Sequence, residues 1–333
     1  MEIGSGAGRR HREDIGGHIC SDLSFEQQFR AEDLYGVWGT LLLPIDRSGS
    51  IAFDALADEI AYLCESGVHG IYSNGTAGEF HNQTEAEFER IHLLLSDLCS
   101  RTGKPFQIGA SHTGARQTLD RIERTKALGP SAFQVILPDW WPPSRDEIAA
   151  FLTRVAEIAA PVPIVIYNPP HAKVQVSLSD LAWLHAQVPN LVGAKLAGGD
   201  AAWYDELRQL PPTLSVFIPG HYMASGCLSG GRGSYSNIAC LSPIGAVRWW
   251  HQIGTDSSAA LELESRINAF LTTHILPLRS LYGLSNMALD KGLAAIGQWG
   301  PIESRILWPY SAMPDQVIEK LRPIARAELP ELF

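Results

Sequence analysis

The chain has 333 residues, of which 45% are hydrophobic and 19% charged, a composition typical of a globular protein with a substantial core. Its formal net charge of −10 provides no basic surface for nucleic acid or an anionic membrane. No apolar run approaches the roughly 20 residues of a membrane-spanning helix, and the N-terminus has no apolar signal core, so we expect a cytoplasmic protein. The five cysteines include no CxxC pair, which is typical of reduced thiols.

Residues 1–34 differ in composition from the rest of the chain. Three glycines, Gly4, Gly6 and Gly8, resemble a phosphate-binding loop, but no strand precedes them and a basic run follows at once. We therefore predict a mobile N-terminal extension, whose Phe25 and Phe29 could pack onto the folded domain or a neighbouring subunit.

From Val37 onward, short β-rich runs alternate with helical patterns, which indicates βα units around a parallel sheet. Eight strands are predicted, at Val37–Leu43, His69–Ser73, Phe106–Ala110, Phe133–Leu137, Ile164–Tyr167, Leu191–Lys195, Ser215–Ile218 and Gly233–Ser236. Eight such units close most economically into a barrel. The predicted fold is therefore α/β, a (β/α)8 TIM barrel over residues 35–241.

Helices are predicted between the strands from apolar residues at three- and four-residue spacing, namely Phe53–Ser66, Thr84–Arg101, Ala115–Leu128, Arg145–Ala160, Ser179–Gln187, Trp203–Leu210 and Met223–Ser229. Thr84, Ser144 and Ser179 are plausible N-caps, because acidic residues follow each of them. Beyond about Ser242 the patterns are only helical, as in Ser257–Leu276 and Asn286–Ile296. Residues 242–333 are thus predicted to form a C-terminal helical subdomain.

Lys195 ends an apolar run that reads as a buried strand. Burying an ammonium without a partner costs several kcal/mol, so such a group tends to lose its proton, and the neutral amine is a nucleophile toward ketones. An isolated strand-end lysine more often extends toward solvent. Here Tyr167 ends another strand 28 residues earlier, and Gly198 and Gly199 follow closely enough to let a ligand approach the backbone. The pattern favours Schiff-base chemistry.

Three segments together resemble the dihydrodipicolinate synthase and N-acetylneuraminate lyase superfamily of class I aldolases. They are the loop Gly75-Thr76-Ala77-Gly78-Glu79, the strand end Tyr167-Asn168-Pro169-Pro170 and the strand end Gly193-Ala194-Lys195. The resemblance runs from about Gly36 to about Leu321. It implies a lyase with a barrel and a helical C-terminal part, assembled as a homo-oligomer, either a dimer or a tetramer.

The resemblance also implies roles for residues at the strand ends. Lys195 would form an iminium with a 2-keto acid, Tyr167 would carry protons, and the Thr76 hydroxyl would hydrogen-bond the tyrosine or the substrate carboxylate. The amides of Ala77 and Gly78 would bind that carboxylate. Two alternatives stay open: Tyr167 could be a core tyrosine bonded to the backbone, and the loop could be a turn that its glycines permit. We interpret Glu79 as structural.

Further residues are candidates for binding the rest of the substrate. Gly220 and His221 follow the seventh strand, and Tyr235 lies in a glycine-rich segment of the eighth. Arg232 either binds a carboxylate or is a solvated loop residue. Trp140 and its neighbour Trp141 resemble a tryptophan-bearing loop of hydratase-aldolases, or cover the barrel mouth or a subunit contact.

Three positions depart from the synthase branch. Ala77 replaces a threonine, Trp140 replaces a tyrosine of a hydroxyl relay, and Ala172 replaces an arginine five residues past the tyrosine. An indole N–H donates but cannot pass on a proton, and alanine cannot bind a carboxylate. We therefore expect an aldehyde that is aromatic or weakly polar. The absence of acids around His221 also disfavours sialic acid.

The predicted function is a Schiff-base lyase, an aldolase or a dehydratase, acting on pyruvate or a substituted 2-keto acid together with an aldehyde. No metal-ligand spacing, Rossmann fingerprint or P-loop is present, so we expect no metal and no cofactor. The alternatives are 4-hydroxy-tetrahydrodipicolinate synthase activity and a barrel that binds a keto acid without turnover.

Overall fold

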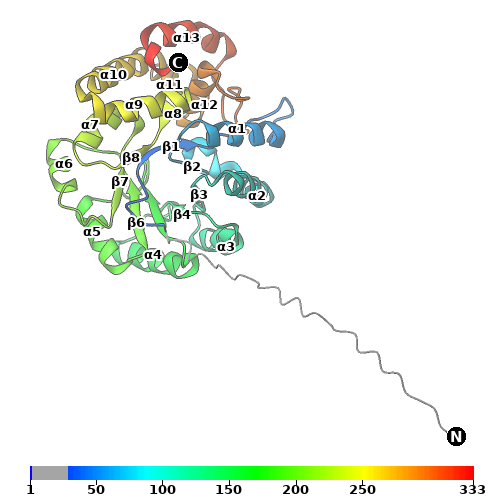
Figure 1. The fold of residues 1–333 in the computed structure, drawn as a ribbon, viewed down its shortest axis with the longest axis vertical. Coiled ribbons are helices and arrows are strands. Elements are labelled where there is room, and N and C mark those ends of the chain that lie inside the picture. Colours follow the sequence, from blue (N-terminus) through cyan, green and yellow to red (C-terminus); the bar gives the residue numbers. More distant parts are fainter. Residues whose placement is uncertain (2–28) are drawn as a thin grey trace.

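The computed structural model describes residue 1 and residues 29–333, and its eight strands form one closed barrel (Figure 1). Each strand pairs in parallel with its two neighbours, and the order around the barrel is the order along the chain. The strands are β1 (Gly36–Thr40), β2 (Gly70–Tyr72), β3 (Phe106–Gly109), β4 (Ala132–Val135), β5 (Ile164–Tyr167), β6 (Leu191–Lys195), β7 (Ser215–Phe217) and β8 (Gly233–Tyr235). The predicted barrel is confirmed, although several predicted strands extend beyond the observed ones.

A helix follows each strand and packs outside the barrel. These helices are α1 (Phe53–Glu65), α2 (Glu85–Thr102), α3 (Ala115–Thr125), α4 (Arg145–Ala159), α5 (Leu178–Gln187), α6 (Ala201–Leu207), α7 (Met223–Leu228) and α8 (Asn237–Leu241). Thr84 and Ser144 form capping boxes as predicted. The cap predicted at Ser179 is wrong. The helix begins earlier, because the Ser177 hydroxyl accepts the Asp180 N–H at 3.0 Å.

The pairing of β5 with β6 contains a bulge. Ile164 pairs with Leu191 but Val165 pairs with Gly193, so Val192 is an extra residue on β6. Beyond the bulge, Tyr167 and Lys195 are directly paired. Since paired residues of parallel strands present their side chains on the same face, both leave the barrel wall at one level.

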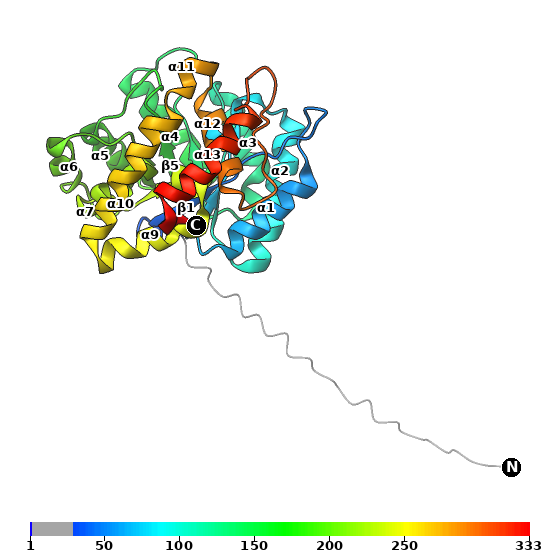
Figure 2. The same ribbon diagram turned by 90° about the horizontal axis from the view of Figure 1, so that it is seen from above.

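Five further helices gather on one side of the barrel, coloured yellow to red in Figures 1 and 2. They are α9 (Pro243–Thr255), α10 (Ser257–Phe270), α11 (Leu278–Tyr282), α12 (Asn286–Gly297) and α13 (Asp315–Glu328). A π-helical turn, Leu271–Ile275, continues α10 where the sequence predicts one α-helix. Helix α12 packs against α8 and against the 3₁₀ turn Thr76–Gly78. The C-terminal helices are as expected, and a domain boundary between residues 241 and 242 stays a prediction.

The chain just before β1 packs against the starts of the barrel strands. Leu34 is fully buried, and its carbonyl oxygen accepts the Ser215 hydroxyl at 2.6 Å. The Phe29 ring meets the Trp38 ring edge-on, 6.2 Å between centres. The predicted N-terminal extension, with Phe25, falls mainly on residues 2–28, outside the described residues. From Phe29 to Leu34 the chain is part of the packed barrel.

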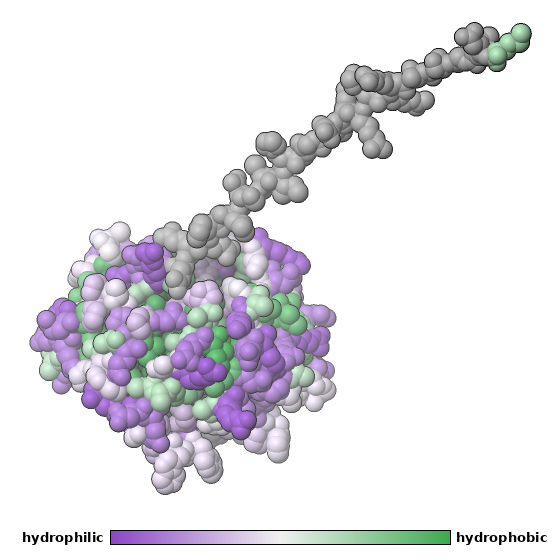
Figure 3. Space-filling model, turned by 90° about the horizontal axis from the view of Figure 1, so that it is seen from below, coloured by the Kyte–Doolittle hydropathy of each residue, from purple (hydrophilic) through white to green (hydrophobic). Residues whose placement is uncertain are grey.

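None of the helices in residues 29–333 is both long and apolar enough to cross a membrane. On the face shown in Figure 3, hydrophilic residues surround smaller groups of hydrophobic ones. Most of the large apolar side chains instead fill the interface between the strands and the surrounding helices. That interface fixes the strand ends on which the candidate site is built.

Candidate active site

Lys195 is the last residue of β6 and lies at the carboxyl end of the barrel. Its Nζ atom is 5.1 Å from the centre of the Tyr167 ring. Burial lowers the pKa of Lys195 to about 8, against an opposing effect of the Asp290 carboxylate. A lysine with this pKa has a far larger neutral fraction at neutral pH than an ordinary lysine, and the neutral amine is the nucleophile.

The glycines after Lys195 shape the chain rather than the space around the lysine. Gly198 has a φ of +80°, and a Cβ atom at Gly199 would lie 2.5 Å from the Trp203 side chain. Neither glycine lines the cavity that contains Lys195. Both positions require glycine because the chain turns into α6 there, and not because a ligand approaches the backbone.

Tyr167 and Thr76 form a hydroxyl pair beside the lysine. The Tyr167 hydroxyl is 2.9 Å from Thr76 Oγ1, and either atom can donate. Burial raises the pKa of Tyr167 to about 12, while the hydrogen bond to Thr76 acts in the opposite direction. The partner of this tyrosine is therefore a side-chain hydroxyl and not only the backbone, as the alternative interpretation required. Such a pair can hold and return a proton.

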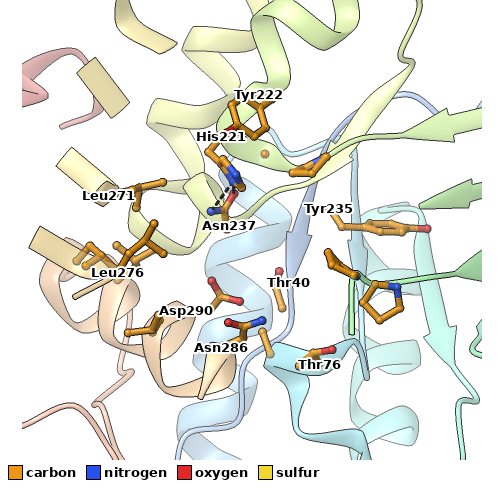
Figure 4. A pocket seen from close by; sticks show the side chains of 18 of the residues that line it. Thr40, Thr76, His221, Tyr222, Tyr235, Asn237, Leu271, Leu276, Asn286 and Asp290 are labelled. Atoms are coloured by element: carbon orange, nitrogen blue, oxygen red, sulfur yellow. Dashed lines mark hydrogen bonds between the residues drawn. The ribbon is translucent and has the colours of Figure 1, made fainter. Parts of the chain in front are cut away.

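Lys195, Tyr167 and Thr76 open into one cavity of about 310 Å³ (Figure 4). Its wall comes from the ends of several strands and from the C-terminal helices. The lining residues are Thr40, Tyr72, Thr76, Ala77, Tyr167, Pro169, Pro170, His171, Lys195, Pro219, Gly220, His221, Tyr222, Tyr235, Asn237, Asn268, Leu271, Thr272, Ile275, Leu276, Arg279, Asn286, Leu289, Asp290 and Leu293. The cavity is large enough for a keto acid with a further substituent.

The structure brings most of the predicted substrate-binding residues to this cavity. Ala77, Gly220, His221 and Tyr235 line it, and Gly220 has no room for a side chain, because a Cβ atom would lie 2.6 Å from Asn237 Oδ1. Figure 4 shows His221 hydrogen-bonded to Asn237, and burial lowers the pKa of the histidine. The Tyr235 hydroxyl donates its hydrogen bond to Gln107 Oε1, so its proton is not free to bond a substrate.

Three predicted residues lie elsewhere. Gly78 is the buried last residue of the turn and donates its N–H to the Gly75 carbonyl at 3.0 Å, which leaves the Ala77 N–H as the turn amide able to meet a carboxylate. Trp140 lies outside the cavity lining with 84% of its surface exposed. Arg232 is exposed and also absent from the lining, as expected for a solvated residue.

A comparison with protein families adds the decisive observation. Residues 33–284 match the model of the dihydrodipicolinate synthetase family. The chain belongs to this family. The match spans the whole barrel and reaches into the C-terminal helices, so it includes every strand end described above.

Members of the dihydrodipicolinate synthetase family and their structural neighbours resemble the chain over most of its length. An uncharacterized DapA-like lyase of Pyrococcus horikoshii is 24% identical over 87% of this chain and 99% of its own. The prophage protein YagE of E. coli K12, solved with pyruvate, has a TM-score of 0.77 at 20% identity, covering 90% and 99% of the two chains. A catalytic lysine mutant of a Ruminococcus gnavus sialic acid aldolase gives 0.78 at 15% identity, covering 91% and 99%.

Two charged residues of the cavity were not found from the sequence of this family member. Asp290 lies on α12 and Arg279 on α11, and both line the cavity. Arg279 donates to Asn286 Oδ1 and brings a cation to the rim of the cavity. Ala172 suggested that the site has no group to bind a second carboxylate. The Arg279 guanidinium weakens that inference. The available signal was the pair Asp290-Lys291, the only charges in an otherwise apolar helix.

A second cavity of about 460 Å³ adjoins the first. The two share Thr76, Tyr167, Pro169, His171 and Asn286, so the Tyr167 hydroxyl stands where they meet. The remaining wall of the second cavity is mainly apolar, formed by Phe80, Ile136, Leu137, Pro138, Ala172, Val174 and Met287 with His81, Thr113, Asp139 and Ser285. Within residues 29–333, no three His, Cys, Asp or Glu side chains are grouped to hold a metal ion.

Proposed function

We propose that this member of the dihydrodipicolinate synthetase family is a Schiff-base lyase that acts on pyruvate or a substituted 2-keto acid. The observation that carries the proposal is the placement of a lysine with a lowered pKa in one cavity with a tyrosine–threonine hydroxyl pair. Nucleophile and proton carrier are then within reach of one substrate carbonyl.

The chemistry follows from the two groups. The neutral Lys195 amine attacks the keto carbon, and the carbinolamine that forms loses water to give an iminium. Tyr167 returns and removes protons in these steps through its contact with Thr76 Oγ1. The iminium withdraws electrons from the neighbouring bond, so that a C–C bond at the adjacent carbon breaks or forms.

The carboxylate of the keto acid needs donors at the other end of the molecule. The Thr76 hydroxyl and the Ala77 N–H supply them in this proposal, since both belong to the turn beside Tyr167. The chemistry uses only groups of the chain, so activity is expected to survive dialysis against a chelator.

The partner fragment is proposed to be aromatic or weakly polar. The support is the second cavity, whose apolar wall adjoins Tyr167 and would gain about 25 cal/mol for each Å² of apolar surface removed from water. Among the described residues, the one arginine that lines either cavity and could pair with a second carboxylate is Arg279, at the exposed rim. Lysine-precursor synthesis is therefore the less favoured assignment.

Borohydride reduction in the presence of pyruvate tests the proposal. The expected result is a reduced adduct on the peptide that contains Lys195, found by mass spectrometry and missing from Lys195→Ala. Lys173→Ala is a matched control, because Lys173 is exposed and bonded to the Trp140 carbonyl oxygen. An adduct on another lysine, or none, would refute the assignment. An adduct at Lys195 without pyruvate release from any 2-keto acid would indicate a binding protein.

A further inference from the structure

Asp290 is a carboxyl group of the cavity that has no hydrogen-bond or ion-pair partner among residues 29–333. It follows Leu289 on α12 and lines the same cavity as Lys195. Among the described residues, no hydrogen bond and no ion pair within 4 Å joins its carboxylate to another side chain. Figure 4 shows Asp290 and Asn286 on one side of the cavity, with Thr40 and Thr76 across from them.

The neighbouring charge on the same helix has the opposite character. Lys291 is fully buried, and its ammonium donates to Glu79 and to the carbonyl oxygens of Leu43 and Arg305. It is satisfied entirely by protein groups. Asp290 is directed away from that network into the cavity, where only a bound molecule or solvent can meet its oxygens.

An unpaired carboxyl group in such a place is costly to keep. Burial raises the pKa of Asp290 to about 7, while the charges of Lys195 and Arg279 act in the opposite direction. The titratable groups that interact with it are Lys195 on β6, Arg279 on α11, Tyr167 on β5, Tyr72 on β2 and Cys240 on α8. Buried ionisable groups whose pKa lies close to neutral pH are typical of sites of proton transfer.

We infer that, when a 4-hydroxy-2-oxo acid is held on Lys195, the Asp290 carboxylate takes the proton from its C4 hydroxyl. The inference rests on the Schiff-base function proposed above. It adds a second proton-transfer residue to that site.

The step balances without a further reactant. The O–H bond at C4 breaks and its proton passes to the Asp290 carboxylate, the C4 oxygen forms a carbonyl, and the C3–C4 bond breaks. Its electron pair forms the C2–C3 double bond of an enamine and neutralises the iminium nitrogen. The aldehyde leaves, a proton is added at C3, and water releases pyruvate from Lys195. The proton on Asp290 returns to solvent.

The charges favour a carboxylate rather than an acid in this step. An iminium carries a positive charge that it cannot lose to solvent, so it holds the neighbouring carboxyl group ionised more firmly than a free amine does. Other groups of the cavity are less suitable. The Tyr167 hydroxyl already serves the steps at the keto carbon through Thr76, and His221 is bonded to Asn237, whereas Asp290 has both oxygens available.

Asp290→Asn tests the inference, because it keeps the volume and removes the base. Two reactions are compared in the full-length protein. Exchange of the C3 protons of pyruvate in D2O, followed by NMR, needs the iminium but no C4 hydroxyl. Cleavage of 4-hydroxy-2-oxo-4-phenylbutanoate and of 4-hydroxy-2-oxopentanoate, followed by pyruvate release, needs both.

The expected result is that Asp290→Asn exchanges pyruvate protons within a few-fold of the wild-type rate and loses roughly 10²–10⁴ in kcat for cleavage. Asp290→Glu should recover part of the loss. Asp58→Asn is the matched control, an exposed aspartate in the middle of α1, and should leave both reactions unchanged.

Three outcomes would overturn the inference. Full cleavage by Asp290→Asn removes the residue from the step, and equal loss of exchange and cleavage shows that it acts on Lys195 alone. A wild-type protein that forms the pyruvate adduct but cleaves neither probe performs no C3–C4 cleavage for Asp290 to assist, and this refutes the step. Absence of any adduct in the wild-type protein is a different failure, that of the Schiff-base function itself.

Discussion

The Glu79 carboxylate and the Lys291 ammonium are 2.5 Å apart and both side chains are completely buried. Glu79 has a φ of +55° and also accepts the Leu307 N–H at 2.7 Å. The pair thus ties the turn that carries Thr76 to α12 and to the segment before α13. Both contacts of Glu79 are with protein groups that hold the turn in place. Glu79 therefore has the structural role expected from the sequence.

Removing one member of this pair should destabilise the protein strongly. Lys291→Met leaves a buried carboxylate with a single amide donor, and loss of one partner of a buried pair typically costs about 3–5 kcal/mol. The measurement is thermal unfolding followed by circular dichroism. Glu157→Gln is the control, since the Arg154–Glu157 pair is exposed and such pairs contribute about 1 kcal/mol or less. Equal shifts in both variants would contradict the prediction.

The pH dependence of adduct formation should report Lys195. Its pKa is lowered to about 8, so the neutral amine is the minor form below this value and its fraction rises about tenfold per pH unit until it levels off. The rate of borohydride-trapped adduct formation with pyruvate should follow that curve between about pH 6 and about pH 10.

A comparison with Asp290→Asn sharpens the pH experiment. The Asp290 carboxylate raises the pKa of Lys195 against the effect of burial, so its removal should shift the midpoint to lower pH. A midpoint near the ordinary lysine value of about 10.4 in the wild-type protein would be incompatible with a desolvated amine.

Tyr167→Phe should preserve the fold and lose roughly 10²–10⁴ in kcat, because it deletes the proton carrier and little volume. Thr76→Val should lose less, about tenfold, since it removes one hydrogen bond from the tyrosine. Steady-state pyruvate release gives both values. Tyr310→Phe, at an exposed tyrosine, is the control. Unchanged kcat in Tyr167→Phe would exclude this residue from the mechanism.

The aldehyde fragment should be selected by the second cavity. We expect kcat/KM for condensation of pyruvate with benzaldehyde to exceed that with aspartate semialdehyde. Ile136→Thr should lower the benzaldehyde value about three- to tenfold, because it replaces apolar wall by a hydroxyl. Leu93→Thr, on the exposed face of α2, should leave it unchanged. A higher kcat/KM for aspartate semialdehyde that falls in Arg279→Met would reverse the conclusion.

The barrel and the Lys195–Tyr167 pair could be predicted because their signals are local. Strand ends are marked by short apolar runs, and parallel strands bring their carboxyl ends to one edge whatever lies between them. Asp290 could not be placed in the same way. It lies on a helix after the eighth strand, and the packing of α12 against α8 and the Thr76–Gly78 turn brings it to the cavity that contains Lys195.

Trp140 shows the converse limit. Its residue type and its position after the fourth strand favoured a role in the cavity, but the ring is exposed to solvent and lines neither of the two cavities. The Lys173 ammonium bonds the Trp140 carbonyl oxygen at 2.8 Å and lies 5.4 Å from its ring centre, which helps to hold this arrangement. Loop direction depends on such contacts, and they leave no periodic trace in a sequence.

The single extra residue in β6 decides which way the candidate nucleophile points. Side chains alternate along a strand, so an odd change in length inverts the facing of everything after it. If β6 paired with β5 without the bulge, with Val192 opposite Val165, Ala194 would stand opposite Tyr167 and the lysine amine would be directed toward the surrounding helices. Whether Lys195 reaches the cavity thus depends on whether the number of paired residues before it in β6 is odd or even. A relative that keeps both motifs but has one residue fewer before its lysine would keep the amine in its cavity by pairing these two strands without a bulge.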